Sequence, residues 1–159
     1  MKIQLDLSKN DYKLFLDTIK FHKDNLRHRI NWVNDEIEYI KKERYNKEEE
    51  KRQIKYCEIV LEEIKNCNNL FKKIENLKNS KESFEITKDE YNELLKFIVE
   101  QTYHAKSRKQ DFSEDRFGWG GDNCNILINQ EDLYINVLMN IFNRYRGKHT
   151  YESILHEIS

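Results

Sequence analysis

The sequence contains no proline and only four glycines among 159 residues. Proline breaks helix interiors and glycine weakens them, so this scarcity leaves little to interrupt long helices. Three of the glycines cluster at Gly118, Gly120 and Gly121. We therefore expect long helices along most of the chain and one irregular segment around this cluster.

The chain also lacks an excess of charge of either sign. It has 28 Lys and Arg against 29 Asp and Glu, a formal net charge of −1, which argues against nucleic acid as the main partner. Charged residues make up 36% of the chain, above the usual share of about 25%, but the apolar residues are periodic. This pattern predicts a folded protein with a polar surface.

Cysteine is scarce, and no long hydrophobic run is present. Cys57 and Cys67 lie ten residues apart on one predicted helix, roughly 15 Å along its axis, which is too far for a disulfide. We expect a reducing, cytoplasmic setting without a signal peptide or membrane span. Abundant Lys, Asn, Ile and Glu is typical of AT-rich genomes, and suggests a bacterium or its phage.

One short stretch occurs twice, at residues 5–12 and 84–91, with a constant offset of 79 residues. Each copy begins with alternating apolar residues, which predicts a strand. Ser8 and Thr87 are each followed three residues later by an acid, the arrangement of a helix capping box. Apolar spacing of three and four then predicts a helix. We interpret the pair as an internal duplication of a strand-to-helix unit.

The first half of the chain predicts a long antiparallel helical hairpin. A helix from Lys9 to Arg44 would span roughly 50 Å, and would either protrude or break at Asn31 or Asn34. Asn46 is expected to cap the second helix. The two heptad-like seams suit a coiled-coil dimer equally well; they comprise Tyr12, Leu16, Ile19, Leu26, Ile30, Val33, Ile37 and Ile40, and Ile54, Cys57, Leu61, Ile64, Phe71, Ile74 and Leu77.

The second half predicts further elements around the glycine cluster. They are a helix from Lys88 to about Arg108, an irregular segment 110–125, a short strand or helix entry at 126–128, a helix from an Asn129 cap to Gly147, and a short helix capped by Thr150. The predicted fold is a predominantly helical α+β protein. It consists of two strand-helix-helix units, residues 1–79 and 80–159, that share a small antiparallel sheet in one compact assembly.

The candidate binding site is the segment 111–123, which combines large aromatic residues with glycines. Trp and Arg are favoured interface anchors, so the segment suits an exposed recognition tip. The alternative is that Trp119 fills the core while the glycines permit the turn. No Lys-Ser pair follows the glycines, so the segment is not a phosphate-binding loop.

Basic residues cluster at 27–29, 106–109 and 144–148. The last two clusters are expected at helix C-terminal ends, where the helix dipole favours cations. Alternatively, these ends converge near the glycines and form an anion site. The candidate residues for binding a protein or an anion are Arg116, Phe117, Trp119, Asp122, Arg144, Arg146 and Lys148.

Catalysis has little support in the sequence. His104, Asp111, Glu114 and Asp122 can be drawn as a metal-assisted hydrolase set, but no motif spacing relates them. We predict no catalytic residues, no metal and no cofactor.

The predicted function is a non-enzymatic binding protein acting on another macromolecule, with a protein as the expected partner. A more specific hypothesis is a small phage or mobile-element inhibitor of a host defence protein. The alternatives are an anion- or nucleotide-binding module and a self-associating structural protein.

Overall fold

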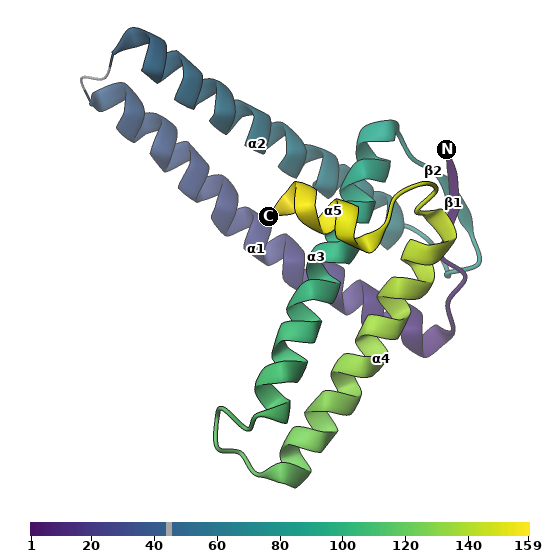
Figure 1. The fold of residues 1–159 in the computed structure, drawn as a ribbon. Helices are drawn as coiled ribbons and strands as arrows, with labels where there is room; N and C mark the ends of the chain where they lie inside the picture. The colour runs from purple at the N-terminus through teal and green to yellow at the C-terminus, as the bar shows by residue number, and fades with distance from the viewer. Residues whose placement is uncertain (44–45) are drawn as a thin grey trace. The chain divides into compact units, whose positions relative to one another are not determined.

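The structure is a computed structural model that describes residues 1–43 and 46–159. Five helices and two short strands are found in these ranges, so the predominantly helical α+β fold predicted from the sequence is confirmed (Figure 1). In chain order the elements are β1 (Lys2–Gln4), α1 (Lys9–Lys42), α2 (Lys47–Glu75), β2 (Ser83–Glu85), α3 (Lys88–Ser113), α4 (Gly121–Tyr145) and α5 (Tyr151–Ile158).

The chain divides into two compact units. Residues Leu16–Leu77 form one, called here the hairpin unit. Residues Met1–Phe15 and Lys78–Ser159 together form the other, called here the mixed unit. The observed boundary before Lys78 lies close to the predicted one after residue 79, but the first fifteen residues group with the C-terminal half. The hairpin unit is therefore inserted in sequence between two parts of the mixed unit.

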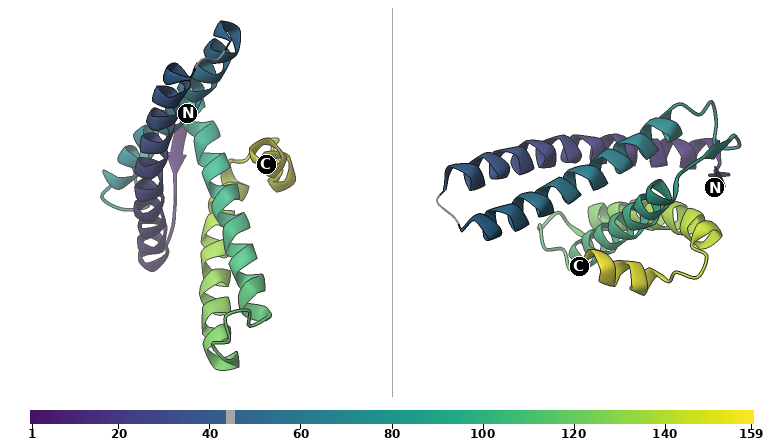
Figure 2. Two further views of the ribbon diagram at one scale, coloured as in Figure 1. Left: turned by 90° about the vertical axis from the view of Figure 1, so that its left-hand side faces the viewer. Right: turned by 90° about the horizontal axis from the view of Figure 1, so that it is seen from above.

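The hairpin unit consists of most of α1 and all of α2, which lie antiparallel and side by side (Figures 1 and 2). Helix α1 continues through Asn31 and Asn34, so the alternative of a break at these residues does not occur. The predicted end at Arg44 lies outside the described residues. The seam residues with the lowest exposure are Ile19, Leu26, Val33 and Ile40 from α1 and Cys57, Ile64, Phe71 and Ile74 from α2.

A polar residue interrupts the α1 seam at Lys23, and the structure explains how it is accommodated. The Lys23 ammonium lies 3.1 Å from a carboxylate oxygen of Glu75 on α2. One residue earlier, the His22 ring meets the edge of Phe71 with a centroid separation of 5.8 Å. The seams are thus used between the two helices of one chain, as the hairpin interpretation requires.

Side-chain caps fix several helix starts where the sequence predicted them. Thr87 and Glu90 form a complete capping box at α3, and Thr150 forms one with Ser153 at α5. The Asn46 side chain accepts a hydrogen bond from the Glu48 amide at 2.9 Å. At α1, Ser8 Oγ accepts from the Asp11 amide at 3.2 Å. Each cap satisfies an amide that has no partner within its own helix.

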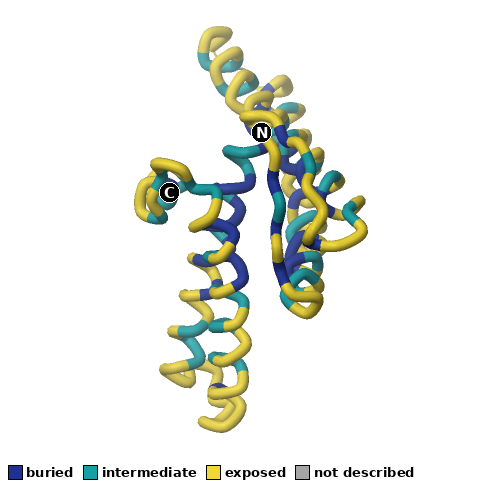
Figure 3. The backbone as a smooth tube through the Cα atoms, turned by 90° about the vertical axis from the view of Figure 1, so that its right-hand side faces the viewer, coloured by how far each residue is buried: buried dark blue, intermediate teal, exposed yellow. Residues whose placement is uncertain are grey.

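Strands β1 and β2 pair antiparallel, as predicted, with Ile3 opposite Phe84. A two-stranded sheet is marginally stable in water, so it needs cover from other elements. Ile3 and Leu5 are completely buried. Figure 3 shows that burial along α3 and α4 is concentrated in the half of this helix pair near β1, whereas the half that carries the α3–α4 loop is mostly exposed.

The α3–α4 connection is shorter than predicted. Helix α3 continues to Ser113 instead of ending near Arg108, and α4 begins at Gly121. Residues 126–128 are therefore helical and not a strand, and Asn129 lies inside α4 and is not a cap. Gly120 permits the early start, because its φ of +89° is readily adopted only by glycine. Gly147 follows the end of α4 with a φ of +59°, as expected for a helix C-terminus.

None of the helices in the described ranges is both long enough and apolar enough to cross a membrane.

Two leucines on α4 test where the core of the mixed unit lies. Leu138 is fully buried, whereas Leu133 is 60% exposed on the same helix. We expect Leu138→Ala to lower the free energy of unfolding by about 2–5 kcal/mol, because it removes apolar contacts and leaves a cavity. Leu133→Ala should change it by less than about 0.5 kcal/mol. Urea denaturation of the two variants measures this difference, and equal losses would contradict the placement of the core.

Candidate functional site

The residues predicted to bind a protein or an anion lie at opposite ends of α4. Arg116, Phe117 and Trp119 are in the α3–α4 loop and Asp122 is in the first turn of α4. The basic residues at 144–148 lie at the other end of this helix of 25 residues, about 37 Å away. A single anion site that includes both Arg116 and Arg144 is therefore not assembled. The alternative in which these helix ends converge near the glycines is therefore wrong.

The basic cluster at 106–109 also lies elsewhere than predicted. Because α3 continues to Ser113, these residues are inside the helix and not at its C-terminal end. Arg108 binds the Glu131 carboxylate of α4 through its Nε at 2.7 Å. Lys109 Nζ lies 2.6 Å from Asp132 Oδ1. The cluster thus contributes ion pairs between α3 and α4 along their more exposed half.

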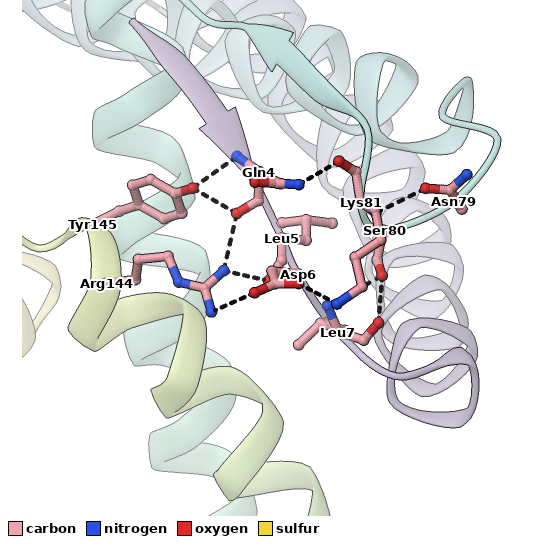
Figure 4. Close-up of polar contacts among 9 residues, drawn as sticks. All are labelled: Gln4, Leu5, Asp6, Leu7, Asn79, Ser80, Lys81, Arg144 and Tyr145. Atoms are coloured by element: carbon pink, nitrogen blue, oxygen red, sulfur yellow. Dashed lines mark hydrogen bonds and ion pairs between the residues drawn. The ribbon is translucent and has the colours of Figure 1, made fainter.

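At the far end of α4, Arg144 and Tyr145 bind the last residue of β1 and the residues that follow it (Figure 4). Arg144 Nη1 donates to the carbonyl oxygens of Leu5 at 2.9 Å and Gln4 at 3.3 Å. The Tyr145 hydroxyl donates to the Gln4 carbonyl at 2.6 Å and accepts from the Gln4 amide at 2.8 Å. Arg146 Nη1 donates to the carbonyl of His149 at 2.8 Å. Both arginines therefore bind the chain's own backbone.

Asp6 is at the centre of this contact, which we call the Asp6 anchor together with Ser80, Lys81, Arg144 and Tyr145. Its backbone is left-handed, with a φ of +51°. Its carboxylate pairs with Lys81 and lies 3.5 Å from Arg144 Nη2, and its amide donates to the Ser80 carbonyl at 2.8 Å. The hydrogen bond from Lys81 lowers the pKa of Asp6 below its usual value. The anchor joins the two sequence segments of the mixed unit, so we assign Arg144 a structural role.

Removing the Tyr145 hydroxyl should weaken the mixed unit. In Tyr145→Phe the Gln4 amide loses its partner in a partly buried position, which we expect to lower the free energy of unfolding by about 1–3 kcal/mol. Thermal or urea denaturation measures the loss. Tyr103→Phe, at an exposed position on α3, is the matched control and should leave stability within about 0.5 kcal/mol. Equal stability of the two variants would contradict a structural role for the hydroxyl.

The Asp6 anchor also predicts how stability depends on pH. Because the folded-state pKa of Asp6 lies below its ordinary value of 3.8, the carboxylate stabilises the fold above that pH. This contribution is lost as the pH falls through the folded-state pKa. Asp6→Asn keeps a residue that tolerates positive φ but removes the charge. Denaturation midpoints should show the variant less stable than the wild type at pH 7, with the difference closing in acid. A constant difference across this range would show that the charge is not responsible.

At the loop end of α4, three rings form a cluster that we call the aromatic tip: Phe112, Phe117 and Trp119. Phe117 and Trp119 are stacked, with centroids 4.8 Å apart and planes 23° apart. Phe112 lies 6.0 Å from Trp119 and 6.3 Å from Phe117. The Trp119 side chain is 51% exposed, and Phe117 is also exposed. Trp119 is therefore not a core residue, and the alternative that it fills the core is wrong.

The loop that carries these rings is braced by its own polar groups. Asp115 Oδ1 accepts from the Trp119 amide at 2.9 Å and from the Cys124 thiol at 3.3 Å. Asn123 Nδ2 donates to the Trp119 carbonyl at 2.8 Å. Asp115 and Gly118 both have positive φ. The backbone on both sides of Trp119 is thus held in place while its ring faces solvent.

A shallow pocket of roughly 360 Å³ adjoins the aromatic tip. Its lining is mostly apolar and comprises Trp119, Asn123, Ile126 and Leu127. Ile126 and Leu127 were not among the predicted site residues, because 126–128 was expected to be a short strand or a helix entry. The available signal was the seven-residue spacing of Ile126 and Leu133, which places both side chains on one face of a helix.

Acidic groups surround the aromatic tip. Residues 111–123 include four carboxylates and one guanidinium, a formal net charge of −3. Arg116 pairs with Asp111 at 3.0 Å and with Glu114 at 2.5 Å. The hydrogen bond from Arg116 lowers the pKa of Glu114, so that carboxylate stays ionised. The remaining acids, Asp115 and Asp122, leave an acidic surface beside the exposed rings.

The residues considered for a hydrolase do not assemble. Asp111 and Glu114 are bound by Arg116, and His104 lies 3.7 Å from Glu100 on its own helix. Among residues 1–43 and 46–159, no group of three or more His, Cys, Asp or Glu side chains is arranged to hold a metal ion. The aromatic tip, with its pocket and its acids, is therefore the candidate functional site.

Comparisons with protein-family models, curated proteins and solved structures found no match to this chain.

Proposed function

We propose that the chain is a non-enzymatic binding protein that engages another protein through the aromatic tip and the adjoining pocket. The observation that carries this proposal is the stacked pair of Phe117 and Trp119, exposed to solvent on a loop that is itself braced by hydrogen bonds. Large exposed rings of this kind are enriched among residues that contribute most to protein interfaces.

The exposed area of the tip is large enough to contribute measurably to binding. A large aromatic side chain presents about 150–250 Å², so covering the exposed half of Trp119 alone removes about 100 Å² from water. At about 25 cal/mol per Å², this is worth about 2–3 kcal/mol. Because the loop backbone is already fixed around Trp119, little conformational entropy is lost when a partner binds.

The charge of the tip favours a basic partner. A Lys or Arg side chain can stack on the Trp119 face as a cation–π pair while its charge is balanced by Asp115 and Asp122. Nucleic acid is disfavoured at this site, because phosphates would meet a surface with a net charge of −3. We therefore propose a protein surface that combines an apolar patch with exposed Lys or Arg.

The alternative of an anion- or nucleotide-binding module gains no support from these contacts. It required the loop and the distal arginines to act together, and Arg144 and Arg146 bind backbone carbonyls instead. The more specific hypothesis of a phage or mobile-element inhibitor of a host defence protein, active in the bacterial cytoplasm, rests on composition. It stays a prediction.

Alanine substitutions at two positions whose wild-type side chains are equally exposed test the proposed site. Trp119 and Tyr103 are both 51% exposed and both belong to the α3–α4 hairpin, but Tyr103 lies outside the aromatic tip. Immobilised wild-type protein and the Trp119→Ala and Tyr103→Ala variants are incubated with lysate of the host cell, and captured proteins are quantified by mass spectrometry. We expect Trp119→Ala to reduce capture of the specific partner at least tenfold and Tyr103→Ala to retain it.

Equal capture of the same partner by wild type and Trp119→Ala would contradict the proposed site. Turnover of a small substrate by the purified protein, together with failure to capture any protein, would contradict the proposed class. High salt should weaken capture if the acidic groups contribute to recognition.

A further inference from the structure

Helix α1 carries three large, exposed aromatic side chains outside its buried seam. Phe21, Trp32 and Tyr39 are 69%, 63% and 51% exposed. Their spacings of eleven and seven residues place them within about 20° of one line along the helix. The buried seam residues, represented by Val33, lie about a third of a turn away. We call the line of Phe21, Trp32 and Tyr39 the outer stripe.

Charged and polar side chains flank the middle of the outer stripe in an ordered way. His28 and Arg29 precede Trp32 by one turn, and Asp35 and Glu36 follow it by one turn. At 100° per residue, His28 and Asp35 lie on one flank of the Trp32 line, and Arg29 and Glu36 lie on the other. The surface is therefore basic on one side of Trp32 and acidic on the other.

This charge pattern on α1 is complementary to the same pattern on a second copy of α1 that runs in the opposite direction. In a parallel pair with a two-fold axis along the helices, opposite flanks face each other, so Arg29 would meet His28 of the partner subunit and Glu36 would meet Asp35 of the partner subunit. In an antiparallel pair with a two-fold axis at Trp32, a residue that follows Trp32 in the sequence of one copy lies opposite a residue that precedes Trp32 in the other copy. Opposite charges on one helix flank then face each other, which stabilises the pair.

We propose that the outer stripe is the interface of a homodimer in which α1 packs antiparallel against α1 of a second copy. Trp32 lies at the two-fold axis and contacts Trp32 of the partner subunit. Arg29 pairs with Glu36 of the partner subunit on one flank, and His28 pairs with Asp35 of the partner subunit on the other. Tyr39 packs near Phe21 of the partner subunit, so the same contacts occur twice, as a two-fold interface requires.

Two further observations fit a second copy as the occupant. His28, Arg29 and Asp35 are exposed and can reach across such an interface, while Glu36 is half-buried beside them. The formal net charge of the chain is −1, so two copies repel each other little. This dimer does not use the heptad seams, which are occupied within the hairpin unit, and it does not involve the aromatic tip.

The oligomeric state in solution tests this interface. Sedimentation equilibrium from low to several hundred micromolar should show wild-type protein approaching twice the monomer mass of 19.5 kDa. Trp32→Ala should raise the dimer dissociation constant at least tenfold. Tyr56→Ala, at an exposed aromatic position on α2 outside the stripe, is the matched control and should leave the dissociation constant unchanged. Circular dichroism checks that each variant is folded.

A charge exchange tests the antiparallel register. Arg29→Glu alone should weaken the dimer, because two acids then face each other on the same flank. Adding Glu36→Arg in the same chain should restore it, because the two positions exchange sign and the pairing is recovered. A wild-type protein that is monomeric at every concentration would overturn the proposal. Failure of the double exchange to restore the dimer would overturn the register, and a greater loss in Tyr56→Ala than in Trp32→Ala would overturn the location.

Discussion

The mixed unit depends on the hydrogen bonds and the ion pair that join the end of α4 to residues 4–6 near the N-terminus. Tyr145 satisfies both the amide and the carbonyl of Gln4, and Arg144 satisfies the next carbonyl while its charge faces Asp6. A short two-stranded sheet has too few contacts to persist alone. With these bonds, residues 1–15 become part of a core formed mainly by residues after Lys78. Arg144, predicted as a candidate residue for binding a protein or an anion, is needed here instead.

In the α3–α4 pair, the residues that stabilise the fold and the candidate binding site lie in different halves. The half of this pair near β1 contains most of its fully buried residues, including Leu94, Leu138 and Phe142. Towards the loop, the two helices are joined by ion pairs of Arg108 and Lys109, and apolar side chains are left exposed. Substitutions of the exposed apolar side chains near the loop therefore cost little folding energy. A recognition surface in this position is free to change its side chains without loss of the fold.

Much of the fold was predictable because its signals are local. The caps at Thr87 and Thr150 and the seams of the hairpin unit follow from short-range patterns, whereas the pairing of β1 with β2 was inferred from the repeated strand-to-helix stretch. Helices α1 and α3 begin at Lys9 and Lys88, which are 79 residues apart, but the internal duplication itself stays a prediction. The run 126–128 was misassigned because a short apolar run suits a strand or a helix equally. The aromatic loop was found from composition, whereas the Asp6 anchor depends on residues some 75 and 140 positions apart, for which the sequence has no local signal.

The insertion of the hairpin unit between two parts of the mixed unit has a consequence for how this protein can vary. The chain leaves the mixed unit after Phe15 and returns at Lys78, and the Asp6–Ser80 backbone bond lies near both crossing points in sequence. The hairpin can therefore be shortened or lengthened by removing or adding matched heptads on α1 and α2, which preserves the seam and leaves the mixed unit intact. Homologous chains are expected to differ in hairpin length in multiples of about seven residues per helix. Hairpin length can thus change, in evolution or by design, without any change in the sequence of the aromatic tip.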